Sequence, residues 1–405
     1  MVAGVGRFLE ELANFHFDEA TLAWLDSAKV LDRPTIDWLA NYRFTGSIWA
    51  YPEGEIYFPG SPIFVVEGTF AEAVILETLA LSILNHDSAI ASAATRMVNA
   101  AGGRPCLEMG SRRAHEQAAV AAARAAVVAG FQGSSNLEAG RRYDIPTIGT
   151  AAHAFTLLND DERTAFASQI DSLGVGTTLL VDTYDVTEAV KTAVDVAGTG
   201  LGAVRLDSGD LVAQAYEVRD LLDSLGAHQT KIVVTSDLDE HAIAALAQAP
   251  VDSYGVGTSL VTGSGAPTAG MVYKLVAREN SAGVLEPVAK KGSGGKAGIA
   301  GRKRSARTYD RDGVALEEVI WADPHERWNS MNSPALELVG AAETQRELLE
   351  PLIMDGELAR ANALGSAGVK QAASHHAAAR AELPRAALRL QRGDPALETV
   401  SRFVE

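Results

Sequence analysis

The stretch Thr147-Ile148-Gly149-Thr150-Ala151-Ala152-His153 decides the fold class, because it places a histidine just after a short β-branched run. Five further runs in the middle of the chain also end in polar or glycine residues, with helical stretches between most of them. This rhythm predicts an α/β fold, an irregular parallel β/α barrel whose catalytic groups gather at the carboxyl ends of its strands. The five runs cover residues 104–109, 178–181, 203–206, 231–235 and 253–256.

Composition narrows the class of protein. The chain has 405 residues, 47% of them hydrophobic, which suits two or three globular lobes with a full core. Its net charge of −17 argues against general binding of nucleic acid. The single cysteine, Cys106, excludes a disulfide framework and a multi-cysteine zinc site, and it favours a reducing cytoplasm. Because Cys106 sits in an apolar run, we expect a buried structural thiol.

The chain is expected to fold as a barrel with a flanking lobe built from both of its ends. Residues 8–43 have helical spacing of apolar residues, 47–69 resemble three short strands with Pro/Gly turns, and 71–100 return to helix. No membrane span is expected. The predicted domains are a flanking α+β lobe over 1–103, the catalytic barrel over 104–277, and a carboxyl-terminal part over 278–405. That last part holds a basic loop, the rest of the lobe and a helical tail that begins near residue 334.

His153 and Asp182 follow successive strands of this rhythm. Neighbouring parallel strands lie about 4.8 Å apart, so the two side chains are within reach of each other. A carboxylate that holds one imidazole nitrogen makes the other a better nucleophile or base. We therefore predict that His153 has a functional role, against the alternative of a structural histidine.

Two other strand ends allow both a structural and a functional interpretation. Asp207, in the run Arg205-Leu206-Asp207, either caps the following helix or binds sugar hydroxyls while Arg205 faces phosphate. Gly255 and Gly257 form either a tight turn or a phosphate site to which Thr258 adds a hydroxyl.

Basic residues supply further candidates. Arg112 and Arg113 open an Ala-rich helix, and one of the two is expected to bind phosphate or carboxylate. The stretch 290–307 is basic in an otherwise acidic chain, and it is interpreted either as a solvated loop or as a loop that closes over polyphosphate. His375 and His376 lack metal-ligand spacing, and we expect both to be exposed to solvent. The candidate loop residues are Lys290, Lys291 and Lys296.

Eight segments together resemble the nicotinate phosphoribosyltransferase family, because they agree with it in order and spacing over roughly residues 1–330. They include LEMGSRRAH, GTAAHAF, LVDTYDV and VRLDSGDL. The full set is Leu107–His115, Gly130–Gly140, Gly149–Phe155, Leu180–Val186, Val204–Leu211, Ile232–Glu240, Tyr254–Thr262 and Met271–Val276.

The resemblance implies a type II phosphoribosyltransferase fold and a cytoplasmic head-to-tail homodimer with shared active sites. The implied reaction joins nicotinate to phosphoribosyl pyrophosphate, giving nicotinate mononucleotide and pyrophosphate, and it uses ATP and Mg²⁺. His153 matches the histidine that ATP phosphorylates, and Asp182 matches the carboxylate that holds it. The other implied site residues are Arg205, Asp207, Gly255 and Gly257 near the phosphoribosyl group, Arg112 near phosphate or pyridine, Ser135 and Asn136 near the pyridine carboxylate, and Thr150, Asp237 and Thr258 as further substrate contacts.

The sequence leaves alternatives for the metal ligands and for the function. Asp207, Asp210 and Asp237 are all candidate Mg²⁺ ligands. The family's amino-terminal segment with a Thr-Asp-Leu-Tyr-Glu-type motif is expected to be missing, because the chain starts at Met1-Val2-Ala3-Gly4. Met109 stands where relatives often carry an aromatic residue. The alternatives are a nicotinamide or quinolinate phosphoribosyltransferase, or a truncated non-catalytic subunit.

Overall fold

The computed structural model describes residues 1–290, 298–323 and 342–403. The chain forms two compact units. Unit 1 comprises Met1–Ser88 with Thr268–Glu405, and unit 2 comprises Ala89–Pro267. The division falls inside the long helix α4 (Phe70–Ala101), whereas the boundary that we expected, at residue 103, follows the end of that helix.

Unit 1 begins with three helices where the sequence predicted helix over 8–43. They are α1 (Val5–Ala13), α2 (Glu19–Ser27) and α3 (Arg33–Leu39). The breaks between them have a local cause, because aspartates cap the second and third helices. Asp18 accepts a hydrogen bond from the Thr21 amide, and Asp32 accepts one from the Thr35 amide.

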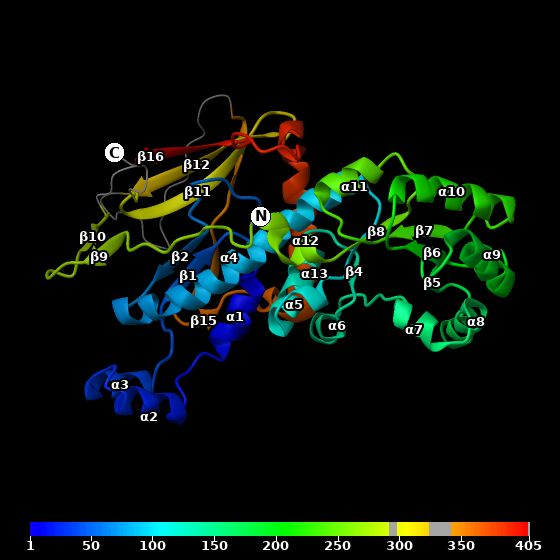
Figure 1. The fold of residues 1–405 in the computed structure, drawn as a ribbon. Helices are drawn as coiled ribbons and strands as arrows, with labels where there is room; N and C mark the ends of the chain where they lie inside the picture. The colour runs from blue at the N-terminus through cyan, green and yellow to red at the C-terminus, as the bar shows by residue number, and fades with distance from the viewer. Residues whose placement is uncertain (291–297, 324–341, 404–405) are drawn as a thin grey trace. The chain divides into compact units, whose positions relative to one another are not determined.

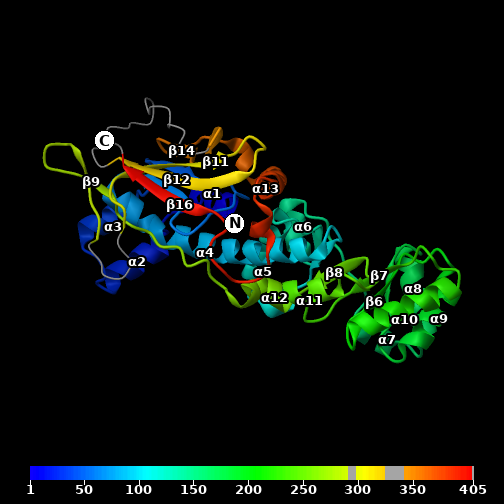
Figure 2. The same cartoon turned by 90° about the horizontal axis from the view of Figure 1, so that it is seen from above.

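Two four-stranded sheets and a hairpin complete unit 1. In the first sheet β1 and β14 are the central strands, in the order β15-β14-β1-β2, and in the second β11 and β12 are central, in the order β13-β11-β12-β16. Strands β11, β12 and β16 lie side by side in Figures 1 and 2. The elements are β1 (Ser47–Ala50), β2 (Phe64–Glu67), β9 (Ala277–Glu279), β10 (Leu285–Pro287), β11 (Arg302–Tyr309), β12 (Ala315–Asp323), β13 (Thr344–Glu347), β14 (Glu350–Met354), β15 (Glu357–Leu358), β16 (Glu398–Phe403) and the helix α13 (Gly365–Ala381).

Two expectations for the secondary structure of unit 1 were wrong. Residues 47–69 contain two strands rather than three. Residues 344–358, expected to be helical, form strands β13, β14 and β15, and α13 is the only α-helix among the described residues of 342–403. Long-range pairing overrides the helix propensity of Glu, Leu and Arg here, because β14 pairs with β1 and β13 pairs with β11. Leu352 and Ile353 of β14 are buried in the core of unit 1.

Helix α4 is long and apolar enough to qualify as a membrane-span candidate, although the sequence analysis expected none. Its unit 1 half carries Leu76, Ile83 and Leu84, which pack against Phe8 of α1 and Ile48 of β1 in the hydrophobic core. A buried core helix meets the same length and composition criteria, so we interpret α4 as the core helix of the fold.

Unit 2 is built on a six-stranded parallel sheet in the order β4-β3-β8-β7-β6-β5. Helices α8, α9 and α10 lie together beside β6 and β7 in Figures 1 and 2. The strands are β3 (Cys106–Glu108), β4 (Gly133–Ser134), β5 (Thr178–Leu180), β6 (Ala203–Leu206), β7 (Lys231–Val234) and β8 (Ser253–Val256), and the helices are α5 (Glu116–Val128), α6 (Leu137–Tyr143), α7 (His153–Leu158), α8 (Glu162–Leu173), α9 (Val186–Ala197), α10 (Leu211–Ser224), α11 (Glu240–Leu246) and α12 (Thr258–Val261).

The strand order follows the chain around a ring, which confirms the predicted irregular parallel barrel. A parallel bridge between Ser134 and Thr147 extends the sheet beyond β4. Within residues 89–267, all of which the structure describes, no pairing joins Thr147 to β5, so the ring is open at this seam. His153 comes between these two edges in the chain and begins α7.

Cys106 is buried in β3, and burial raises the pKa of its thiol to about 12, as expected for a structural thiol.

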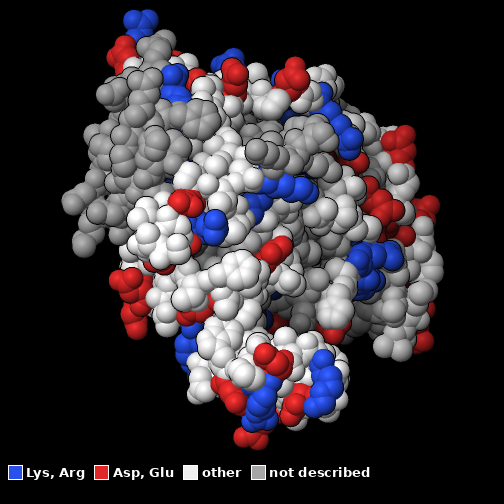
Figure 3. Space-filling view, turned by 90° about the vertical axis from the view of Figure 1, so that its left-hand side faces the viewer, with Lys and Arg blue, Asp and Glu red and all other residues white. Residues whose placement is uncertain are grey.

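Figure 3 shows one face of unit 1, on which basic and acidic side chains are interspersed. This face has no broad basic patch among the residues that the structure describes.

Candidate active site

Three neighbouring strands of unit 2 deliver polar side chains to one edge of the sheet. Asp182 comes just after β5, Asp207 directly follows β6, and Thr235 directly follows β7. The strands are parallel and in adjacent register, with Leu180 opposite Arg205 and Leu206 opposite Val234. Their carboxyl ends therefore meet, as the sequence predicted.

Asp182 is an almost fully buried carboxylate that holds the loop after β6. Its Oδ2 accepts hydrogen bonds from the Asp207 amide at 2.9 Å and from the Ser208 hydroxyl at 3.0 Å. Its Oδ1 is buried and has no hydrogen-bond partner among the described residues. One oxygen of Asp182 thus fixes Asp207, and the other is left for a donor that comes closer.

The His153 imidazole lies between two carboxylates. Its Nε2 is 4.0 Å from Oδ1 of Asp182 and 3.8 Å from Oδ2 of Asp207, and its Nδ1 is 3.2 Å from the hydroxyl of Thr183. The side chain is 43% exposed. The structure brings His153 and Asp182 together as predicted, but Asp207 is the nearer carboxylate. Both distances exceed the length of a hydrogen bond, so each is a charge–charge contact if the ring is protonated.

Arg205 joins Thr150, Asp207 and Thr235 into one cluster, which we call the Arg205 cluster. Its guanidinium donates to Oγ1 of Thr235 at 2.8 Å and to Oγ1 of Thr150 at 2.6 Å, and it pairs with Oδ1 of Asp207 at 2.9 Å. The same Oδ1 accepts a hydrogen bond from Thr235. Burial alone would raise the pKa of Asp207, but hydrogen bonds from Thr235 and Arg205 and the charge of Arg205 lower it below its usual value. Asp207 is thereby held as an anion.

Two loops form a second polar region, after β3 and β4. Oδ1 of Asn136 caps α6 by accepting from the Ala139 amide at 2.9 Å, and its Nδ2 donates to Ser111 at 3.0 Å. The amide of Ser135 donates to the carbonyl of Glu108 at 2.8 Å. Arg112 and Arg113 follow Ser111 in a 3₁₀ turn, and both side chains are exposed. The structure therefore brings Asn136 beside the arginine-bearing turn without singling out one arginine.

The glycines after β8 have a packing role. A Cβ at Gly255 would lie 2.5 Å from Cγ2 of Thr235 and 2.8 Å from the sulfur of Met109. A Cβ at Gly257 would lie 3.3 Å from the Met109 carbonyl. These contacts account for Gly255 through close approach of neighbouring strands, so the predicted phosphate contact of Gly255, Gly257 and Thr258 stays a prediction. Thr258 is half-buried and begins α12.

Strain marks the end of β7. Ser236 has a φ of 144°, a region that residues other than glycine rarely adopt. It lies between Thr235 of the Arg205 cluster and the exposed Asp237. Such strain concentrates at functional sites, where the surrounding structure holds it. The predicted role of Asp237 near substrate stays a prediction.

The fit of Mg²⁺ to this edge depends on which oxygens are already used. Within the described residues, no group of three or more His, Cys, Asp or Glu side chains is arranged to hold a metal ion. Asp210 caps α10 through the Ala213 amide, and Asp207 gives one oxygen to Arg205 and Thr235. Asp237 is exposed. One or two carboxylates plus phosphate oxygens suit Mg²⁺, so a role for Asp237 as a metal ligand stays a prediction.

The basic stretch 290–307 proved largely structural where it is described. Arg302, Arg304 and Arg307 belong to β11 and pair with Glu67, Glu347 and Glu55 respectively. Such pairs neutralise the local excess of positive charge. Lys290 is exposed, whereas Lys291 and Lys296 lie outside the described residues, so the proposed polyphosphate loop stays a prediction.

The expectation that His375 and His376 are exposed was wrong. His376 is buried on α13, its Nδ1 lies 3.0 Å from the Gly54 carbonyl, and burial lowers its pKa to about 4. Nε2 of His375 is 2.9 Å from Oε2 of Glu55. The polar, Ala-rich sequence of α13 did not indicate these contacts, because the partner residues Gly54 and Glu55 lie on a distant segment of the chain.

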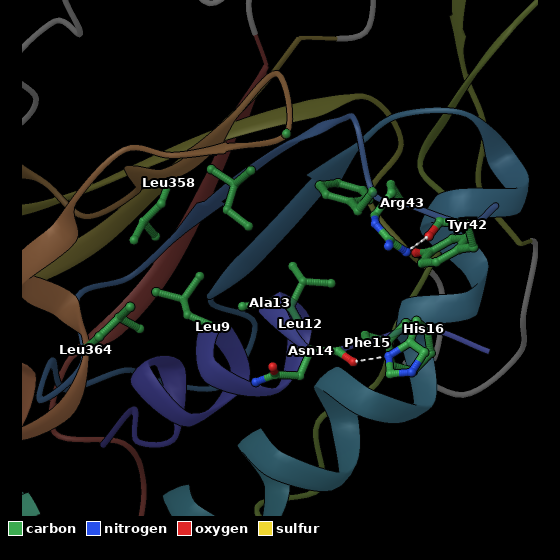
Figure 4. Close-up of a pocket in the computed structure, with 13 residues that line it drawn as sticks. Leu9, Leu12, Ala13, Asn14, Phe15, His16, Tyr42, Arg43, Leu358 and Leu364 are labelled. Atoms are coloured by element: carbon green, nitrogen blue, oxygen red, sulfur yellow. Dashed lines mark hydrogen bonds between the residues drawn. The ribbon is translucent and has the colours of Figure 1, made fainter. Parts of the chain in front are cut away.

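Unit 1 also contains a cavity of about 390 Å³ that holds none of the predicted site residues. Figure 4 shows its lining, in which Leu9 and Leu12 of α1 face Arg43 and Tyr42. The Arg43 guanidinium bonds the Tyr42 carbonyl, and Nδ1 of His16 lies 2.7 Å from the Asn14 carbonyl. The pocket is mostly apolar and is separate from the strand ends described above.

Sequence reasoning missed three residues that contribute to the candidate site: Glu108, Thr183 and Thr235. Thr235 closes a β-branched run, and its position beside Arg205 follows only from the pairing of β6 with β7. Glu108 shares the face of β3 with the buried Cys106, so strand alternation was a usable signal for its burial.

Comparisons with known proteins identify the family of this chain. The family model of the nicotinate phosphoribosyltransferase (NAPRTase) family matches residues 105–292, and that of the NAPRTase N-terminal domain matches residues 1–85. Nicotinate phosphoribosyltransferase pncB1 of Mycobacterium tuberculosis is 52% identical over 98% of this chain and 85% of its own length. Nicotinate phosphoribosyltransferase of Bacillus subtilis is 39% identical over 76% of this chain and 65% of its own.

The fold is shared with a solved human structure. The crystal structure of human nicotinic acid phosphoribosyltransferase superposes with a TM-score of 0.81 and 24% identity, covering 99% of this chain and 90% of that one. The predicted barrel with a flanking lobe is thereby confirmed. With its two matching domains, its curated relatives and this shared fold, the chain belongs to the nicotinate phosphoribosyltransferase family.

Proposed function

We propose that this chain transfers the phosphoribosyl group of phosphoribosyl pyrophosphate to nicotinate and couples the transfer to ATP hydrolysis through phosphorylation of His153. Family membership supports the transfer reaction. The observation that carries the coupling is the half-exposed imidazole of His153 beside two carboxylates, Asp182 and Asp207. A histidine in this setting can act as a nucleophile while its second nitrogen is held by a carboxylate.

The geometry favours Nδ1 as the nucleophile, because Nε2 is the nitrogen that faces Asp182 and Asp207. In the proposed step, Nδ1 attacks the γ-phosphorus of ATP, the P–O bond to the leaving group breaks, and ADP departs with the electron pair. Nε2 keeps its proton, and the two carboxylates stabilise the positive charge on the ring. Hydrolysis of the phosphohistidine later releases phosphate and restores the histidine.

In the transfer step, the ring nitrogen of nicotinate forms a bond to ribose C1 as the bond from C1 to pyrophosphate breaks. Pyrophosphate leaves with the electron pair. Asp207, held as an anion by Arg205, is placed to bind ribose hydroxyls and to stabilise positive charge at C1. Mg²⁺ would neutralise charge on the departing pyrophosphate, and Asp237, an exposed carboxylate just after β7, would help to hold it.

The test measures nicotinate mononucleotide formed from nicotinate and phosphoribosyl pyrophosphate, with and without ATP and Mg²⁺. We expect product from the wild type, a rise on adding ATP, and loss of that rise in His153→Ala. His228→Ala is the matched control, because His228 is an exposed histidine of the same unit that pairs with Asp223. Replacing nicotinate with nicotinamide tests the substrate class, and we expect little product.

Two outcomes would count against the proposal. If the wild type formed no product under any of these conditions, the transfer reaction itself would be wrong for this chain. If His153→Ala kept the full ATP response, the histidine would not be the site of coupling, although the transfer reaction would stand.

A further inference from the structure

Glu108 is a fully buried carboxylate at the carboxyl end of β3, beside the two loops of the second polar region. Its Oε1 accepts a hydrogen bond from the Gly110 amide, and its Oε2 accepts one from the Ser134 hydroxyl at 2.5 Å. The first bond holds the loop that follows β3, and the second holds the end of β4. Each carboxylate oxygen therefore binds a different loop.

The bonds continue from Glu108 into a closed ring. Oγ of Ser134 also accepts the amide of Asn136 at 2.8 Å, and the side chain of Asn136 donates to Oγ of Ser111 at 3.0 Å. The carbonyl of Glu108 accepts the Ser135 amide at 2.8 Å. The two loops are thus joined at two points, by Glu108 to Ser134 and Ser135 and by Ser111 to Asn136.

Backbone pairing alone gives these loops little support. Strand β4 has two residues, and β3 pairs with it only through Leu107 opposite Gly133 and Glu108 opposite Ser134. The side-chain bonds of Glu108 add to the few backbone bonds that set the distance between the loops. Burying a carboxylate without partners costs several kcal/mol, so this residue is unfavourable here unless its hydrogen bonds are formed.

We propose that Glu108 is a positioning residue for the nicotinate subsite: it holds the Ser111–Arg113 turn and the Ser135–Asn136 segment in the spacing that an aromatic carboxylate needs. The inference rests on the proposed function above. Because Glu108 is fully buried, it acts through these loops and does not touch substrate. Its effect is expected on the KM for nicotinate and not on the KM for phosphoribosyl pyrophosphate, which the Arg205 cluster binds in the proposed function.

The experiment compares Glu108→Ala with Glu108→Gln. Glutamine can still accept from Gly110 and can donate to Oγ of Ser134, whereas alanine can do neither. We expect Glu108→Ala to raise the KM for nicotinate by about tenfold or more, as expected from loss of bonds to a charged group, with kcat and the KM for phosphoribosyl pyrophosphate changed by less than about threefold. Glu108→Gln is expected to stay within about threefold of the wild type in all three constants.

Two further variants provide an alternative to Glu108→Ala and a control. Ser134→Ala removes one of the two bonds with a smaller change of volume, and it should also raise the KM for nicotinate if Glu108→Ala does not fold. Glu240→Gln is the matched control, because Glu240 is a buried glutamate of the same unit that bonds Arg96 and Ser264. It should leave the KM for nicotinate unchanged.

Amide hydrogen exchange of residues 109–113 and 133–137 gives a readout that does not depend on turnover. Faster exchange in both segments of Glu108→Ala, with the rest of unit 2 unchanged, supports the inference. Equal loss of both substrates in Glu108→Ala, or an unchanged KM with unchanged exchange, would overturn it. A wild type without activity but with the exchange effect would contradict the proposed function alone.

Discussion

Arg205 in unit 2 and Arg307 in unit 1 both lie on β strands and both bind carboxylates, yet they have different surroundings. Arg205 is 13% exposed and its partner Asp207 28% exposed. Arg307 is fully buried between Glu55 and Glu318, also fully buried. We call Glu55, Arg307, Glu318, Arg346 and His375 the Glu55 network. The comparison shows that solvent access separates a pair that can still meet a ligand from one that only holds the fold.

This difference in solvent access predicts that replacing the arginine with methionine reduces stability at Arg307 and activity at Arg205. In unit 1, Arg307→Met would leave Glu55 and Glu318 buried without their shared cation. Removal of one partner of a buried pair costs about 3–5 kcal/mol of unfolding free energy, because an uncompensated charge remains. All five tryptophans belong to unit 1 by residue number, so urea unfolding followed by tryptophan fluorescence measures this effect.

The exposed Arg311→Met in the same unit is the control, and it should change the unfolding free energy by less than about 0.5 kcal/mol. A loss below about 1 kcal/mol in Arg307→Met would mean that the Glu55 network does not depend on this cation.

In unit 2, Arg205→Met should spare the tryptophan-detected transition and reduce activity. Removing a charged donor from a preorganised site costs about 10²–10³ in rate, so we expect kcat/KM for phosphoribosyl pyrophosphate to fall by about that factor. Arg219→Met is the matched control, since Arg219 also pairs with an aspartate, Asp223, on α10 away from the strand ends. Full activity in Arg205→Met would remove the Arg205 cluster from the proposed mechanism.

The smallest effect that we expect is a dependence of stability on pH. Burial alone would raise the pKa of Glu55. Hydrogen bonding to His375 and the charges of Arg307 and Arg346 instead hold this pKa well below its unfolded value of 4.5. A lowered pKa means that its stabilisation is present above about pH 4.5 and is lost as the pH falls toward the folded pKa. Glu318 has the opposite shift, because burial raises its pKa.

The difference in unfolding free energy between the wild type and Glu55→Gln isolates the contribution of the Glu55 carboxylate. We expect it to be on the order of 2 kcal/mol at pH 7 and to shrink at pH 3. A difference that stayed constant across this range would show that the charge of Glu55 contributes nothing to stability. Unfolding at both pH values, monitored by fluorescence, measures it.

Much of the barrel follows from local sequence. The runs at 203–206 and 253–256 match β6 and β8 residue for residue, because a β-branched or apolar run ended by polar and glycine residues is a local signal. The placement of His153 near Asp182 follows from the same rhythm. Residues 344–358 were missed because Glu, Leu and Arg favour a helix locally, and only pairing with β1 and β11 makes them strands.

The sequence by itself determined the family, the strand ends and the candidate residues, because these depend on residue types and short spacings. Only the tertiary structure decided which charges are buried. Arg307 resembled part of a basic loop, and its partner Glu55 lies 252 residues away in the chain. Glu108 became a loop anchor only when β3 met β4. Most of this burial and pairing depends on distant segments that contact one another after folding, so residue types and short spacings alone do not specify it.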